Sequence, residues 1–100
     1  MVEPKKNYSV HLPTYVLKSV YRKKLFFELV KKPYQTQAQL LKKTEIALKY
    51  RSHVSRTIKE LLDHDLIECE NPLEKSYKMY KLSEQGLKVK DEIEKYEQNY

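Results

Sequence analysis

The stretch Ser55–Glu68, SRTIKELLDHDLIE, constrains the fold of this chain more than any other, because it joins a helical pattern to a turn and a strand. The apolar side chains of this helix fall on one face, at Val54, Ile58, Leu61 and Leu62. The opposite face carries Ser52, Arg56 and Lys59. The helix is expected to start between Tyr50 and Ser52 and to end near His64. Asp65 follows, and aspartate tolerates a left-handed turn. One face is therefore available to a core and the other to a partner.

Two strands and a last helix are expected to follow. Residues 66–70 and 77–82 predict a hairpin, in which Tyr80 and Leu82 alternate as in a half-buried strand. The polar connection holds residues typical of turns, Asn71, Pro72 and Ser76. Ser83 can cap a helix that reaches about Tyr96 or beyond.

Two helices and an arm are expected upstream. Thr14 can cap a first helix that reaches about Lys32 and stops at Pro33, with an apolar stripe of Leu17, Tyr21, Leu25 and Leu29. Thr36 can cap a short second helix, to about Thr44, whose inward residues are Leu40 and Leu41. Ile46 and Leu48 are expected to fill the angle before the third helix. Residues 1–13 are expected to form an N-terminal arm, with Tyr8, Val10 and Leu12 alternating before Pro13.

This order of helix, strand, polar turn, strand and helix is that of a winged helix-turn-helix. The chain resembles the MarR-type and ArsR-type winged-helix transcriptional regulators, many of them archaeal, over roughly residues 14 to 86. Their pattern runs roughly S-R-x-L-K-x-L-x-x-x-G-L-I, then a polar wing, then Y-x-L-T-x-x-G, and Asp65 stands where they usually have glycine. The resemblance implies an α+β, mostly α fold. Residues 14–82 would form the winged helix-turn-helix DNA-binding domain, and residues 83–100 a C-terminal dimerisation helix.

The distribution of charge favours a polyanionic partner. The 100 residues hold 20 Lys and Arg against 14 Asp and Glu, a net charge of +6. Between Lys31 and Lys59, eight bases stand against one acid, whereas residues 60–74 hold six acids and no base. The basic part coincides with the predicted helix-turn-helix, so nucleic acid is the favoured partner. No RNA-binding aromatic motif is apparent, which favours double-stranded DNA.

Three segments are predicted to contact DNA. In the third helix, Arg56 can donate a bidentate pair to guanine in the major groove, or else support the fold or touch the backbone. Its neighbours on this helix are expected to contact bases or phosphates, namely Arg51, Ser52, His53, Ser55 and Lys59. Thr36 and Gln37 suit a phosphate at the start of the second helix, or serve only as a cap. The hairpin tip can lie along the backbone or in the minor groove through Lys75, Ser76, Tyr77 and Lys78. Alternatively this tip is only solvated, because Glu70 and Glu74 beside it would repel phosphate.

Two groups of apolar residues, beyond those that a small core can bury, predict a homodimer. Phe26, Phe27 and Val30 lie off the apolar stripe of the first helix. The last helix carries the seam of a short coiled coil, at Val89, Ile93, Tyr96 and Tyr100. A chain of this length has little core in which to hide both groups, so a two-fold dimer is expected to bury them and to present paired recognition helices.

The sequence predicts neither an enzyme nor a metal or cofactor site. It lacks a glycine-rich phosphate loop and an acid–base pair at a meaningful spacing. The spacings of His11, His53, His64 and Cys69 match no recognised metal-ligand pattern. A single cysteine is typical of a reducing compartment, and no apolar run reaches the length of a membrane span. We therefore expect a cytoplasmic protein with no membrane partner and no identifiable small-molecule effector.

A second class of function is a winged-helix module that mediates protein–protein interaction within the transcription machinery. The acidic run from Glu60 to Glu74 favours this alternative, because it would repel a phosphate backbone. Binding to random duplex DNA at low salt would distinguish the two classes.

Overall fold

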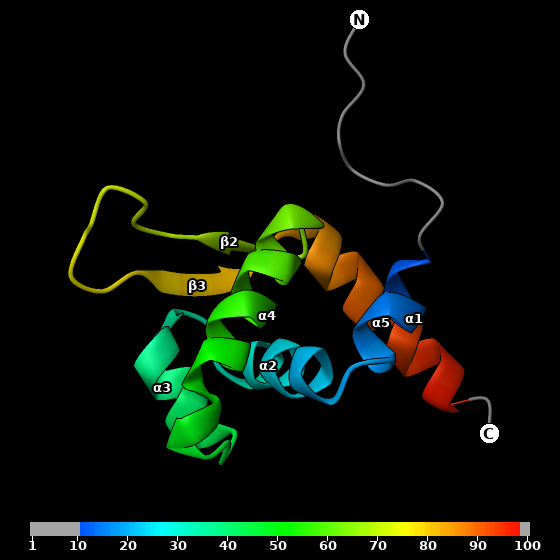
Figure 1. Ribbon diagram of the computed structural model, residues 1–100. Helices are drawn as coiled ribbons and strands as arrows, with labels where there is room; N and C mark the ends of the chain where they lie inside the picture. Colours follow the sequence, from blue (N-terminus) through cyan, green and yellow to red (C-terminus); the bar gives the residue numbers. More distant parts are fainter. Residues whose placement is uncertain (1–10, 99–100) are drawn as a thin grey trace, which may run out of the picture.

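The structure is a computed structural model that describes the backbone of residues 11–98 and the side chains of residues 11–96 (Figure 1). Its helices are α1 (Leu12–Leu17), α2 (Val20–Lys31), α3 (Gln37–Lys43), α4 (Arg51–Asp63) and α5 (Glu84–Gln98), with a 3₁₀ turn η1 at Leu48–Tyr50. Its strands are β1 (Gln35–Thr36), β2 (Ile67–Cys69) and β3 (Met79–Leu82). They form one antiparallel sheet in the order β1-β3-β2. The predicted α+β, mostly α class is confirmed.

Helix α4 lies at the centre of the molecule, and its predicted apolar face is confirmed. Val54, Ile58 and Leu61 are buried against α2, α3 and the sheet, and Leu62 is half-buried. Thr57 is also buried, and its hydroxyl donates to the His53 carbonyl oxygen at 2.8 Å. The helix ends as expected, because Asp65 adopts a left-handed conformation with φ of 58°.

The hairpin of β2 and β3 is also confirmed, and its loop extends away from the helical body (Figure 1). Strand β1 was not predicted. Two residues are too few to show an alternating pattern, and β1 exists because Gln35 and Thr36 pair with Tyr80 and Met79 of β3. The sheet therefore ties the start of α3 to the hairpin.

The predicted single helix over residues 14–32 is wrong. The chain breaks at Lys18–Ser19 into α1 and α2, and the Ser19 hydroxyl caps α2 by accepting from the backbone N–H of Arg22 at 3.2 Å. Leu17 is consequently exposed and not part of an inward stripe. The predicted arm also needs correction, because Leu12 and Pro13 begin α1. Residues 1–10 of that arm lie outside the described residues.

The connection from α3 to α4 was predicted only in part. Thr36 caps α3 as expected, and Leu40, Leu41 and Ile46 are buried. Leu48, however, is 70% exposed in η1 and does not fill the angle between the helices.

Three residues assigned by sequence to a dimer interface lie in the core of the single chain. Phe26 of α2 is fully buried in the core, and Ile93 is fully buried and Val89 is 3% exposed where α5 folds back against α1 and β3 (Figure 1). Phe27 and Val30 are half-buried against the same core. The Phe27 ring lies edge-on to the Phe26 ring, with 5.3 Å between their centroids. Tyr96 is exposed, and Tyr100 lies outside the described residues. Phe26, Val89 and Ile93 thus present no surface to a second copy.

Candidate nucleic-acid interface

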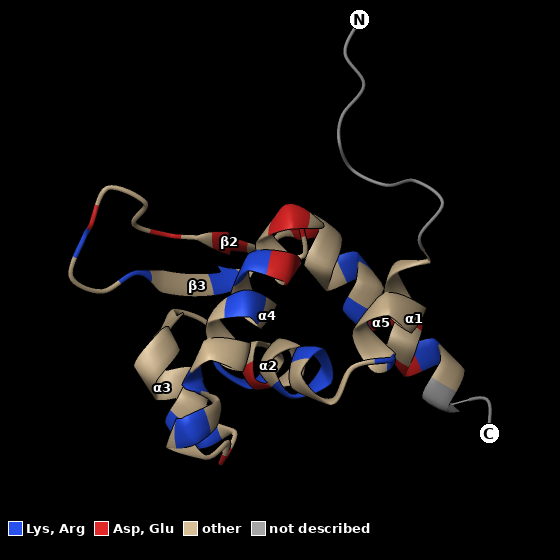
Figure 2. Cartoon of the chain, viewed as in Figure 1, with Lys and Arg blue, Asp and Glu red and all other residues tan. Residues whose placement is uncertain are grey.

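The outward face of α4 presents five of the predicted contact residues to solvent. The exposed side chains are Arg51, Ser52, Ser55, Arg56 and Lys59. Within the described part of the chain, neither Arg56 nor Lys59 forms an ion pair. Their charges are therefore free to meet an anion. Figure 2 shows basic positions along α4, with acidic positions gathered toward its C-terminal end and the base of the hairpin.

A short hydrogen bond joins this face to the start of α3. Gln37 Nε2 donates to Ser55 Oγ at 2.6 Å, which links two predicted contact residues that lie 18 positions apart. Thr36 is occupied in a capping box: its hydroxyl accepts from the Gln39 N–H at 3.2 Å, and its own N–H donates to Gln39 Oε1 at 2.9 Å. Thr36 therefore positions Gln37 and has little capacity left for a ligand of its own.

The hairpin tip lies beside the start of α3. Thr36, Gln37 and Ala38 line a shallow groove together with residues 75–78 and Tyr80. Asn71 shapes the tip, because its Oδ1 accepts from the Met79 N–H at 2.7 Å and its Nδ2 donates to the Tyr77 carbonyl oxygen at 3.1 Å. All three predicted contact segments are thus brought together, although the sequence separates the first from the last by about forty residues.

Two features of the hairpin tip were not predicted. The sequence placed Asn71 in the turn but gave no sign that both ends of its amide would hold the loop. Leu73 is 94% exposed, and its only signal was an apolar residue inside a polar turn. Lys78 Nζ donates to the Pro72 carbonyl oxygen at 2.9 Å, which fixes this cation at the tip.

His53 lies apart from the exposed face. Its ring stacks on Tyr21 of α2 at a centroid distance of 5.5 Å and an interplanar angle of 11°. The Tyr50 ring lies 5.7 Å away at a tilt of 52°. His53 therefore packs α4 against α2 and is not oriented outward with Arg56. Sequence periodicity placed His53 and Arg56 on the same helix, but it did not reveal that Tyr21 of α2 covers the His53 ring.

The acidic run of residues 60–74 is partly neutralised within the fold. Glu60 pairs with Arg22 at 3.3 Å, and the Arg22 guanidinium also lies over the Tyr15 ring at 3.8 Å from its centroid. Glu70 and Glu68 approach Lys81 Nζ at 3.2 and 3.5 Å. The hydrogen bond to Glu70 is the main reason that the pKa of Lys81 is raised. These three carboxylates therefore oppose an approaching phosphate less than the sequence suggests.

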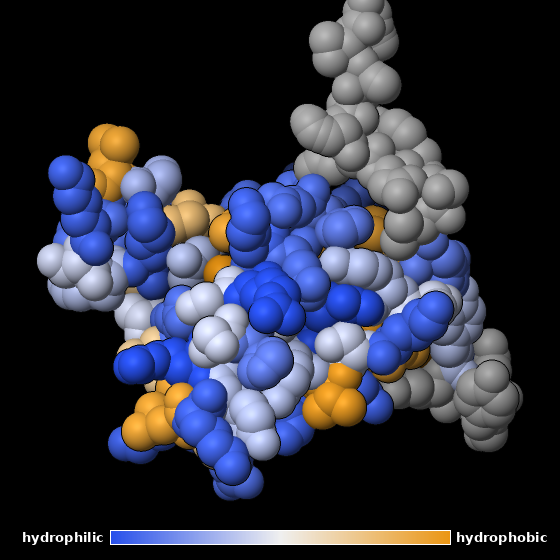
Figure 3. Space-filling model, in the orientation of Figure 1, coloured by the Kyte–Doolittle hydropathy of each residue, from blue (hydrophilic) through white to orange (hydrophobic). Residues whose placement is uncertain are grey.

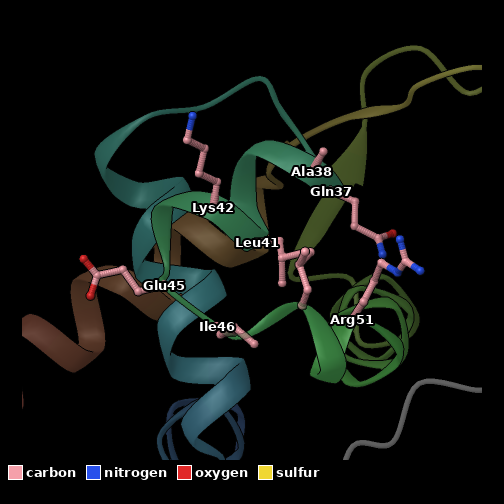
Figure 4. Close-up of a pocket in the computed structure, with 8 residues that line it drawn as sticks. Gln37, Ala38, Leu41, Lys42, Glu45, Ile46 and Arg51 are labelled. Atoms are coloured by element: carbon pink, nitrogen blue, oxygen red, sulfur yellow. The ribbon is translucent and has the colours of Figure 1, made fainter.

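A second groove adjoins this surface between α3 and the start of α4 (Figure 4). Leu41 and Ile46 form its apolar wall, and Glu45 turns the chain there with φ of 60°. Gln37 and Arg51 stand at its edge, where Figure 4 shows their side chains extending to the same side. Figure 3 shows the face over α4 as largely hydrophilic, with separate hydrophobic patches near α3 and at the hairpin tip.

The histidines lie in three separate places. Each ring faces a tyrosine: His11 lies against Tyr96, His53 against Tyr21 and His64 against Tyr15. Within residues 11–96, no three His, Cys, Asp or Glu side chains gather as a potential metal-binding group. None of the described helices is long and apolar enough to cross a membrane.

Comparison with family models, with curated proteins and with solved structures finds no match for this chain.

Proposed function

We propose that this protein is a winged helix-turn-helix transcriptional regulator that binds double-stranded DNA sequence-specifically. In this proposal α3 and α4 are the helix-turn-helix, α4 is the recognition helix in the major groove, and the β2–β3 hairpin is the wing. The observation that carries it is the continuous surface formed by the outward face of α4, Gln37 and the hairpin tip. Affinity would come mainly from lysine and arginine meeting phosphates, and selectivity from a few side chains of α4.

A gel-shift titration on random duplex DNA tests the general activity. The protein is expected to bind weakly at low salt, and the association constant is expected to fall linearly with salt on a double-logarithmic plot. Selection from a random duplex pool then identifies any preferred sequence. If the protein does not shift random duplex even at low salt, the DNA-binding proposal is wrong and the interaction-module alternative replaces it.

Arg56→Ala is expected to weaken binding to a selected site by about 1 to 3 kcal/mol, with a smaller loss on random duplex. The reason is that the Arg56 side chain is exposed on α4, opposite the buried Val54 and Ile58. Fluorescence anisotropy on both DNAs measures the two losses, with Lys88→Ala on α5 as a matched control of an exposed cation. Equal losses on both DNAs would make Arg56 a phosphate contact, and no loss would remove it from the interface.

The Lys75→Ala/Lys78→Ala double variant is expected to lower affinity for all duplexes alike. The salt slope is expected to fall by about two, because each of the two lysines would neutralise one phosphate in the wild-type complex. Both lysines are exposed at the tip beside α3. The exposed pair Lys88 and Lys95 of α5 supplies the control double variant. A slope that matches wild type would show that the hairpin tip is solvated in the complex.

We further propose that the regulator acts as a two-fold dimer. Since Val89 and Ile93 are buried, the exposed Leu87 and Tyr96 are the apolar residues of α5 that remain for a symmetry mate. Sedimentation velocity at micromolar concentration is expected to show a dimer that Leu87→Glu dissociates without loss of helical content. A monomeric wild type at that concentration would contradict the dimer, while leaving the DNA-binding test unaffected.

A further inference from the structure

An exposed groove lies outside the proposed DNA surface, along the outer side of α2 and the end of α3. Its apolar floor consists of Leu17, Val20 and Phe27. Val20 is 67% exposed and Leu17 is also exposed, while Phe27 is half-buried at the bottom. Residues 20, 24, 27 and 31 repeat at intervals of four, three and four, so they share one face of α2. Helix α2 therefore carries a face on which Val20 and Phe27 alternate with Lys24 and Lys31, in addition to the face that packs into the core.

Lysines surround this floor. The groove is lined by five of them, at Lys18, Lys23, Lys24, Lys31 and Lys43. All five are exposed, and none forms an ion pair within the part of the chain that the structure describes. Two acids also line the groove, and one of them, Glu28, accepts a hydrogen bond from Gln35 Nε2 at 3.2 Å. The groove is therefore strongly positive around its apolar floor.

We propose that this groove binds an acidic protein segment that carries apolar side chains at helical spacing. The apolar side chains would lie over Val20 and Phe27, and the carboxylates would meet the lysine rim. A nucleic-acid backbone satisfies the lysines but leaves the apolar floor without a partner. A neutral apolar peptide fills the floor but leaves five cations uncompensated.

The chain itself supplies no suitable occupant. Residues 1–10 contain Lys5 and Lys6 against Glu3, so their charge does not complement the groove. In a second copy, Glu60, Glu68 and Glu70 would already be paired with Arg22 and Lys81 of their own chain, and the apolar residues among them, Leu61, Leu66 and Ile67, are buried. Residues 84–96 of a second copy hold four acids against three lysines, so they carry little net negative charge. The proposed partner is therefore a different, acidic protein. This inference extends beyond DNA binding, because the outward face of α4 takes no part in the groove.

Fluorescence anisotropy with a labelled synthetic peptide tests the chemistry of the partner. The probe is rich in Asp and Glu and carries Leu and Phe at intervals of three and four residues, so that its apolar residues fall on one helical face. One control peptide replaces every acid by its amide, and the other replaces every Leu and Phe by Ser. Wild-type protein is expected to bind the probe at low salt and to bind each control peptide at least about tenfold more weakly. Failure to bind the probe, or equal affinity for either control peptide, would overturn the proposal.

Variants of the full-length protein place the binding in this groove. Val20→Ser and the double variant Lys24→Gln/Lys31→Gln are each expected to weaken probe binding about fivefold. Leu73→Ser and Lys88→Gln/Lys95→Gln are matched controls, since they change an exposed leucine and two exposed lysines elsewhere, and they are expected to have no effect. Circular dichroism confirms that each variant is folded.

Two further results separate this inference from the proposed function. Arg56→Ala, which is expected to weaken DNA binding, is expected to bind the peptide as wild type does, because Arg56 takes no part in the groove. The second result compares the variants on several polyanions. If Val20→Ser has no effect on peptide binding, and the lysine variant weakens binding to the peptide, to random duplex DNA and to anionic phosphatidylserine vesicles by the same factor, the lysines bind polyanions in general and the proposal is overturned.

Discussion

Ile93→Asp is expected to unfold the protein to a large extent. Ile93 is fully buried in α5, where that helix packs against α1 of the same chain. A carboxylate at this position would lose its hydration without gaining a partner, at a cost of about 4 to 5 kcal/mol. Small domains are stable by only about 5 to 15 kcal/mol, so this single change removes much of the folding free energy. Urea denaturation followed by circular dichroism measures the loss.

Lys95→Asp provides the matched control on the same helix. Lys95 is exposed, so a carboxylate there keeps its hydration and is expected to change the free energy of unfolding by less than about 1 kcal/mol. The comparison also decides between two roles of α5. If the Ile93→Asp protein stayed folded and only its self-association were weakened, Ile93 would lie between subunits, as the sequence alone suggested.

Gly86→Ala is expected to destabilise the protein, although the same change usually stabilises a helix. In an exposed helix interior, alanine is favoured over glycine by about 1 kcal/mol. A Cβ at Gly86, however, would overlap the backbone carbonyl oxygen of Leu66. That oxygen is held in place because it accepts from the Ser83 N–H at 3.1 Å. The net loss is therefore expected to be about 2 to 3 kcal/mol.

Thermal and urea denaturation of Gly86→Ala measures this effect, with Lys88→Ala in the same helix as the control. Lys88 is exposed, so its replacement is expected to leave stability within about 0.5 kcal/mol of wild type. A Gly86→Ala protein more stable than wild type would mean that α5 does not approach Leu66 so closely. Gly86 is the only glycine of the chain, and the close approach to Leu66 explains why it occupies a helix.

The sequence by itself determined the elements whose signals are local. The spacing of Val54, Ile58 and Leu61 fixed the buried face of α4, because side chains three and four residues apart share one face of a helix. Asp65 marked its end, since few other residues tolerate a positive φ. Thr36 marked the start of α3 through a cap that involves only its own first turn. The two strands of the hairpin and the last helix, capped by Ser83, were likewise predicted from local patterns of alternation and capping.

Tertiary structure alone decided which apolar faces are covered and which charges are free. Periodicity identified Phe26 and Ile93 as apolar residues needing burial, but only the packing of α2 and α5 around one core shows that a single chain buries both. It could not foresee β1, which depends on pairing with β3 more than forty residues away. Nor could it show that Glu60 is neutralised by Arg22 while Arg56 stays free. These outcomes depend on contacts between distant segments, and a local pattern contains no information about which distant segment comes to lie beside it.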